Sequence, residues 1–174
     1  MPMELYDFLL DMGSFPQREL PADDLRSTRN ENSGLPGARR YLGQAAAFRL
    51  AWEADPSLLE GFTLVRGDVL TVPPERRKAC LAHLMAQAAQ GSCGAQEVFR
   101  RVGRHIGQIS REMEPLLQPR TRVRYLFGRF VKEPVCFRLL QEGCRETAPS
   151  LVLEAADEEL SCTPLMRALA AQGV

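Results

Sequence analysis

The residues of this sequence that are best placed for chemistry follow two short apolar runs in its second half. Gly128 stands at the end of the run Val123–Phe127, and Asp157 comes soon after the run Ser150–Ala155. Ligands of open α/β sheets bind outside the carboxyl ends of the strands, so a ligand site is expected where these two runs end. A glycine there lets a ligand approach the backbone closely, although an ordinary turn requires the same residue.

Charged residues flank both positions. Arg129 and Lys132 could face an anionic group, or they could be solvated at the surface like most exposed charges. The acidic run 157–159 could hold a cation, but it precedes the predicted helix Leu165–Ala171, where negative charge also favours the helix dipole. From these residues alone Gly128, Asp157, Arg129 and Lys132 stay candidates at this edge beside the commoner interpretations as turn and solvated residues, and the sequence gives neither a catalytic residue nor a set of metal ligands.

The histidines and cysteines form no recognised site. The sequence shows no partner of defined geometry for His83 or for His105, so both are interpreted as structural or solvent-facing residues. The cysteines are odd in number and include no C-x-x-C pair, which argues against a zinc site and against a complete disulfide framework. We expect buried, reduced thiols at Cys80, Cys93, Cys136, Cys144 and Cys162.

Several classes of function lack support in the sequence. No P-loop, G-x-S-x-G, H-E-x-x-H or G-x-G-x-x-G motif occurs. The net charge is zero, so the chain lacks the field that gathers nucleic acid or an anionic membrane. No apolar run approaches the roughly 18 residues of a membrane span, and the amino terminus lacks the pattern of a signal peptide. We expect a cytoplasmic protein with neither a nucleic-acid partner nor a membrane partner.

Composition divides the chain into an amino-terminal arm and one larger domain. Residues 1–40 combine a predicted strand, Glu4–Met12, with a polar stretch rich in proline and glycine, Gly13–Arg40. An ordered loop of that length often binds a partner or contacts another subunit, although a solvated connector is an equal alternative. Residues 41–174 form the predicted α/β domain, which is long enough to bury a core.

Hydrophobic periodicity predicts three helices in the middle of the chain. They cover Tyr41–Ala54, Glu75–Gln90 and the stretch from Ala95 to about Leu116. Asp55-Pro56 ends the first, because a residue before proline disfavours the helical conformation. The short run Phe62–Val65 fits either a strand or a loop anchor, and the sequence does not decide between them.

The third of these helices is the most regular and contains two glycines. Gly103 and Gly107 stand four residues apart, and each lowers helix propensity by roughly 1 kcal/mol relative to alanine. Such a pair is typical of a helix to which another backbone packs closely. The apolar residues of this helix recur every three or four positions and trace one stripe, with the arginines largely outside it. The stripe consists of Val98, Val102, Ile106, Ile109, Met113 and Leu116.

After this helix the pattern predicts a β-α-β unit. The strands are Val123–Phe127 and Ser150–Ala155. The helix between them begins at Glu133-Pro134, since proline is tolerated in the first turn, and it ends near Gly143 or Thr147. We expect the two strands to be parallel and their connection to be right-handed.

In this order, the elements resemble the carboxyl-terminal part of the ROK family (repressors, open reading frames and sugar kinases), which belongs to the actin-like, hexokinase-like ATPases. The resemblance covers about three-quarters of the chain. The segment Leu5–Gly13 is also similar to the strand that precedes the family's zinc-binding segment. The similar segments in the larger domain are Tyr41–Trp52, Gly103–Ile109, Leu126–Phe130 and Leu151–Leu169.

The resemblance implies a helix-rich α/β fold, the ribonuclease H-like carboxyl-terminal lobe of an actin-like ATPase, with a small mixed sheet packed by long helices. It places Gly128 and Arg129 at the turn beside the adenosine of a nucleotide. The family's amino-terminal lobe, with its phosphate loop and its Asn-Asp pair, has no counterpart here. Its cysteine-rich zinc motif is also missing, since Asn30–Arg40 contains no cysteine. Where the family has two or three glycines, this chain has one, followed by Arg129 and Phe130, and their bulk opposes adenosine binding.

Phosphoryl transfer needs a metal–phosphate cradle and a group that orients the attacking hydroxyl, and half of a cleft cannot supply both. We therefore expect a non-catalytic module derived from ROK kinases, without a cofactor, that acts by protein association or by weak binding of a sugar or nucleotide. Self-association as a homodimer is expected to involve Gly13–Arg40. The alternative is one part of a split or truncated ATP-dependent sugar kinase, whose partner is the missing amino-terminal lobe. A ROK repressor is less favoured, because no helix-turn-helix precedes Leu5.

Overall fold

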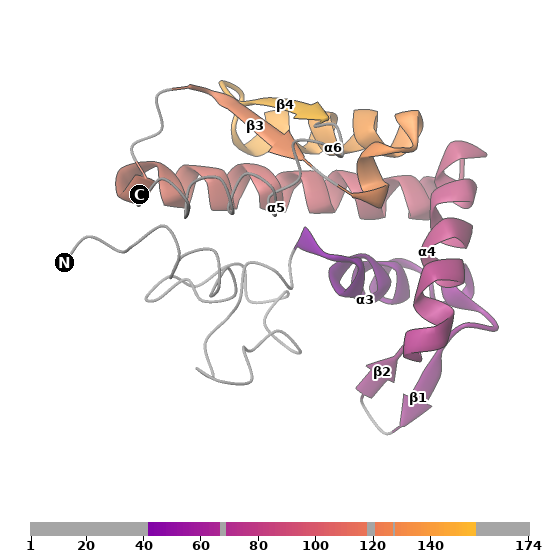
Figure 1. Ribbon diagram of the computed structural model, residues 1–174. Coiled ribbons are helices and arrows are strands. Elements are labelled where there is room, and N and C mark those ends of the chain that lie inside the picture. Colours follow the sequence, from indigo (N-terminus) through magenta and orange to yellow (C-terminus); the bar gives the residue numbers. More distant parts are fainter. Residues whose placement is uncertain (1–41, 67–68, 118–120, 127, 156–174) are drawn as a thin grey trace, which may run out of the picture.

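The computed structural model describes residues 42–66, 69–117, 121–126 and 128–155 (Figure 1). The predicted strand Glu4–Met12, the stretch Gly13–Arg40, the acidic run 157–159 and the predicted helix Leu165–Ala171 lie outside these residues. The described part has an α/β fold rich in helix. Its elements in chain order are α3 (Gln44–Ala54), η2 (Pro56–Leu59), β1 (Leu64–Arg66), β2 (Val69–Thr71), α4 (Pro74–Ala89), α5 (Cys93–Leu117), β3 (Val123–Leu126), η3 (Arg129–Val131), α6 (Pro134–Thr147) and β4 (Val152–Ala155).

The first described helix, α3, ends where the sequence predicts. Asp55 is extended and is the N-cap of the short 3-10 helix η2, where its carboxylate accepts a hydrogen bond of 2.9 Å from the backbone N–H of Ser57. Hydrogen bonds from the side chain and from the backbone N–H of Ser57 lower the pKa of Asp55 below its ordinary value. A proline at the next position reinforces the break, because it cannot donate a backbone hydrogen bond.

The undecided run Phe62–Val65 leads into a strand. β1 pairs with β2 in an antiparallel hairpin, and Arg66 lies opposite Val69. Helix α4 follows, and its five buried residues are the ones on the side that the sequence predicts. These residues are Cys80, Leu81, Leu84, Met85 and Ala88. The prediction of α4 is therefore confirmed.

The long helix α5 and helix α6 pack with their backbones in contact. A Cβ atom on Gly103 would overlap the carbonyl group of Leu140, and a Cβ atom on Gly143 would overlap the carbonyl group of Arg100. A Cβ atom on Gly107 would overlap the hydroxyl of Thr147. The expected close approach at the two glycines of α5 is therefore confirmed, and α6 supplies a third glycine to the same contact.

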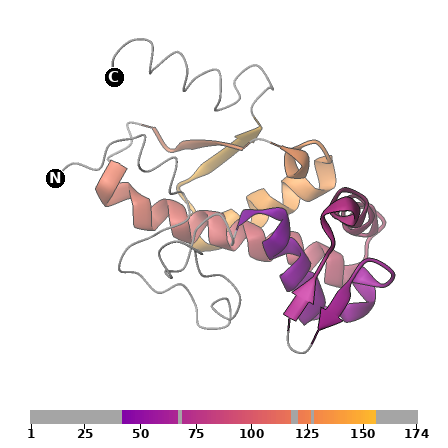
Figure 2. The same cartoon turned by 60° about the horizontal axis from the view of Figure 1, so that its bottom comes forward.

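Strands β3 and β4 are parallel, as expected for the β-α-β unit, with Val123 opposite Val152 and Leu126 opposite Ala155. The sheet lies over one side of α5, while α3 and the β1–β2 hairpin lie on the other side (Figures 1 and 2). Within the described residues the strands therefore form two separate two-stranded sheets, and not one mixed sheet.

One contiguous core joins α3, α4, α5 and α6 and extends to the sheet through Leu151 and Leu153. Four residues of the predicted stripe on α5 are buried, namely Val98, Val102, Ile106 and Ile109. No helix in the described part of the chain is long and apolar enough to cross a membrane. The largest fully buried side chains are Phe99, Leu50, Leu59, Leu84, Leu139, Leu140, Val98 and Val102.

Candidate functional site

The candidate ligand edge begins where β3 ends. Gly128 has φ 95° and ψ −161°, a backbone conformation that residues with a side chain rarely adopt. A Cβ atom at this position would meet no other atom within 4 Å. The glycine is therefore required by the conformation of the turn, and the space beside it is open to solvent or to a ligand.

The two bulky residues after this glycine take different positions. Arg129 is exposed, whereas Phe130 is partly buried and packs edge-on against Phe99 of α5, with ring centroids 5.7 Å apart and an interplanar angle of 86°. Such edge-to-face contacts stabilise a core beyond simple burial. Phe130 is thus a core contact, and of the two residues only Arg129 stands at the surface beside the glycine.

The amino terminus of α6 also lies after this turn and already holds a carboxylate. An Oε2 atom of Glu133 accepts a hydrogen bond of 2.7 Å from the backbone N–H of Cys136, and Pro134 occupies the first helical position. The free N–H groups of a helix amino terminus attract anions. Here Glu133 neutralises that attraction, so the end of α6 is a poor place for a phosphate group.

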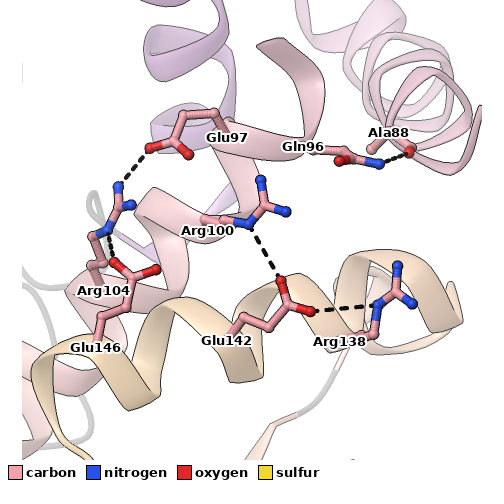
Figure 3. Close-up of polar contacts among 8 residues, drawn as sticks. All are labelled: Ala88, Gln96, Glu97, Arg100, Arg104, Arg138, Glu142 and Glu146. Carbon is pink, nitrogen blue, oxygen red and sulfur yellow. Dashed lines mark hydrogen bonds and ion pairs between the residues drawn. The ribbon is translucent and has the colours of Figure 1, made fainter. Parts of the chain in front are cut away.

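Two arginines of α5, Arg100 and Arg104, form ion pairs with α6 and within α5 (Figure 3). Arg104 lies between Glu146 of α6 and Glu97 of α5, and its Nη1 atom is 2.6 Å from Oε1 of Glu97. The hydrogen bond with Glu146 is the main cause that raises the pKa of Arg104, and Glu97 adds to it. Arg100 pairs with Glu142 at 3.3 Å.

Arg101 reaches in another direction and lies 3.5 Å from Glu53 of α3. The carboxylates of Glu53, Glu97, Glu142 and Glu146 therefore balance the charge of the arginines along this part of α5. An arginine-rich helix that would look basic by its sequence thus carries its cations in local pairs.

The two histidines lie apart from the candidate edge. His83 is exposed on α4, where its ring packs on Phe62 with centroids 5.2 Å apart, and the side-chain amide of Gln87 lies 2.7 Å from its Nε2 atom. His105 is buried within α5 and is 5% exposed. One histidine is therefore solvent-facing and the other is an interior residue, the two alternatives that the sequence left for them.

Three of the cysteines are buried free thiols. Burial raises the pKa of Cys80 to about 11, and it also raises the pKa of Cys136 and of Cys144. A thiol with a raised pKa is protonated at neutral pH and is a weak nucleophile. The expectation of buried, reduced cysteines is confirmed for these three, whereas Cys93 is free but exposed at the start of α5.

In the structure, Gly128 and Arg129 begin the short 3-10 helix η3, which directly precedes the amino terminus of α6. Among residues 42–66, 69–117, 121–126 and 128–155, no group of three or more histidine, cysteine, aspartate or glutamate side chains could hold a metal ion. Asp157, the second position predicted at this edge, lies outside the described residues. The sequence interpretation missed the role of Glu133, although an acceptor side chain directly before a helix that starts with proline is a usual capping signal.

Comparisons with known proteins do not assign the chain to a family. The chain matches no family model, no curated protein and no solved structure.

Proposed function

We propose that this chain is a non-catalytic cytoplasmic module, derived from the carboxyl-terminal lobe of a ROK sugar kinase, that acts by protein association or weak ligand binding. The order of the elements supports the proposal. A long helix with glycines precedes a parallel β-α-β unit, and a glycine turn follows the first strand of that unit. The ribonuclease H-like fold of that lobe is part of the same proposal.

One observation carries the non-catalytic part of the proposal, namely the carboxylate of Glu133 at the amino terminus of α6. A lobe that helps to transfer a phosphoryl group should offer free N–H groups or cations where its strands end. This edge instead places a negative charge on the end of α6, and Arg100, Arg101 and Arg104 of α5 are engaged with carboxylates. Arg129 remains beside the Gly128 turn as an exposed cation for a weakly held ligand.

Turnover and binding assays on the whole chain test this proposal. We expect no phosphorylation of hexoses when the chain is incubated with ATP and Mg²⁺. A thermal-shift screen with nucleotides and hexoses measures weak binding, because a ligand present at about 100 times its Kd stabilises the fold by about 2.7 kcal/mol. Any such shift should decrease in Arg129→Ala and persist in Arg138→Ala, whose arginine lies on α6 and pairs with Glu142. ATP-dependent turnover by the chain alone would refute the proposal.

Light scattering tests the association. We propose a homodimer that involves the segment Gly13–Arg40, so the full chain should be dimeric at tens of micromolar and a chain that starts at Tyr41 should be monomeric. Circular dichroism and thermal unfolding of the shortened chain serve as the control for correct folding. A full chain that is monomeric and also binds no nucleotide or hexose would refute both protein association and weak ligand binding.

The geometry of Gly128 favours the second candidate, one part of a split or truncated ATP-dependent sugar kinase. The turn is open on the side where a Cβ atom would stand, so a ligand can approach its backbone. In this case the chain should gain ATP-dependent activity when it is mixed with a separate lobe that carries a phosphate loop and a catalytic aspartate. The same mixture made with a Gly128→Val chain should show less activity, because a side chain would fill that space.

A further inference from the structure

The sheet formed by β3 and β4 buries only one of its faces. Side chains alternate along a strand, and Leu153 on the inner face is 3% exposed. On the outer face Tyr125 is 55% exposed and Val152 is 50% exposed. These two are the exposed large hydrophobic residues of the described part of the chain, and they lie on the same face because Tyr125 is opposite Glu154, two residues after Val152.

A bare face is unusual for parallel strands. Connections between parallel strands place helices on the faces of the sheet, so such sheets are typically covered on both sides. Here α6 follows β3 and contacts β4, and the inner residue Leu153 joins the core that α5 and α6 share. Tyr125 and Val152 therefore mark a face that a second layer would bury.

We propose that the segment Leu165–Ala171 of this chain covers the outer face of the β3–β4 sheet as a helix. The chain leaves β4 at Ala155, at the carboxyl end of the sheet and opposite Leu126. Residues 156–164 can span about 30 Å when extended, at roughly 3.3 Å per residue. A strand of four residues is only about 13 Å long, so the connection is long enough to bring the segment back over the face.

The sequence of this segment fits the face. Thr163 precedes Pro164, a capping residue followed by proline at the first helical position, and this pair favours a helix start. At about 100° per residue, Leu165, Met166 and Leu169 fall within about 100° of one another, and Arg167 falls on the opposite side. Such a helix presents an apolar side to Tyr125 and Val152 and keeps its charge in water. This proposal stands apart from the proposed function, because it involves neither the ligand edge nor the segment Gly13–Arg40.

Paired variants of the full chain test the contact. Leu169→Asp should lower the thermal midpoint by several degrees, whereas the matched control Arg167→Asp, on the opposite side of the same helix, should leave it nearly unchanged. Hydrogen exchange should rise in β3 and β4 of Leu169→Asp and stay constant in α4, which serves as the internal reference. Equal effects of the two variants, or faster exchange in α4 alone, would overturn the proposal.

A double-mutant cycle adds a readout that depends on contact. If Leu169 packs on Tyr125, the effects of Leu169→Ala and Tyr125→Ala on the folding equilibrium constant should deviate from additivity by at least about twofold. Strictly additive effects would overturn the proposal. A coupling that disappears on dilution, together with a change from dimer to monomer in light scattering, would instead assign the face to a second copy of the chain and would also overturn it.

Discussion

The contact between α5 and α6 and the outer face of the β3–β4 sheet are the two extremes of packing in this molecule. In the first, Gly103, Gly107 and Gly143 bring two helix backbones into direct contact. In the second, Tyr125 and Val152 stand half exposed on strands that belong to the same β-α-β unit. The difference teaches that α6 anchors this unit through α5, and that within the described residues the sheet contributes one face to the core and leaves Tyr125 and Val152 exposed on the other.

The largest expected effect on stability comes from placing a side chain in the contact between α5 and α6. Gly143→Ala places a Cβ atom against the backbone of Arg100, which no side-chain movement can relieve, so we expect a loss of about 3 kcal/mol or more in the free energy of unfolding. Urea denaturation measures it. The matched control is Gly94→Ala in α5, where the new atom meets only the side chain of Leu58 at 3.3 Å, so the gain in helix propensity should offset the contact. Equal costs for the two variants would mean that the backbones are not in contact.

The second largest effect is the pH dependence of stability that the buried thiol of Cys80 should cause. The pKa of Cys80 in the folded state, about 11, lies above its unfolded value of 9.0. The contribution of this thiol to the free energy of unfolding is therefore fully present below pH 9.0. The contribution is lost between pH 9.0 and about 11, by about 2 kcal/mol. Urea titrations at pH 8, 9, 10 and 11 measure the loss, and Cys80→Ala should show a smaller dependence on pH over this range. The same slope in both proteins would show that Cys80 ionises freely in the folded state.

The third effect concerns the turn that joins the sheet to α6. Gly128→Ala forces a side chain into φ 95°, which should cost about 1–3 kcal/mol although the space around it is open. Thermal unfolding measures the cost. Gly94→Ala again serves as the control for a glycine in an ordinary helical conformation. If Gly128→Ala left the free energy of unfolding unchanged, the turn would have a backbone conformation that any residue can adopt.

The smallest effect is expected from the ion pairs that border the tight contact. Arg104→Ala removes the partner of Glu97 and Glu146 and should cost at most about 1 kcal/mol, because these carboxylates are exposed or nearly so. The cost should fall at 0.5 M salt, since salt screens partly exposed charges. Arg138→Ala, on the exposed side of α6, should cost still less. A cost for Arg104→Ala that salt does not reduce would assign its role to packing of its aliphatic stem.

The sequence located the four α-helices and the two strands of the β-α-β unit well, because each depends on local signals. It left β1 undecided and did not predict β2. The periodic stripe of α5, the break at Asp55-Pro56 and the start of α6 at Pro134 depend on residues within one or two turns of one another. The glycine spacing in α5 also predicted close packing. It could not identify Gly143 as the opposing residue, because nothing local relates two positions about forty residues apart.

The candidate edge was predicted less completely. Its location after β3 follows from the rule for open α/β sheets, and Gly128 does adopt a conformation that glycine favours. The bulk of Phe130 was expected to oppose a ligand there, but its ring turns toward Phe99. That orientation depends on the position of α5, which the residues around Gly128 do not encode.

By itself, the sequence determined where the α-helices lie, that the two strands of the β-α-β unit run parallel, and that the glycine pair of α5 suits close packing, since propensity, periodicity and short connections are properties of neighbouring residues. Only the tertiary structure decided that Arg100, Arg101 and Arg104 of α5 pair with carboxylates, and that one face of the β3–β4 sheet leaves Tyr125 and Val152 half exposed in the described part of the chain. The cap of Glu133 on α6 was encoded locally, because its carboxylate and the N–H of Cys136 are only three residues apart. The ion pairs and the exposed face depend on how elements that are distant in the sequence meet in space. Neighbouring residues do not encode such contacts.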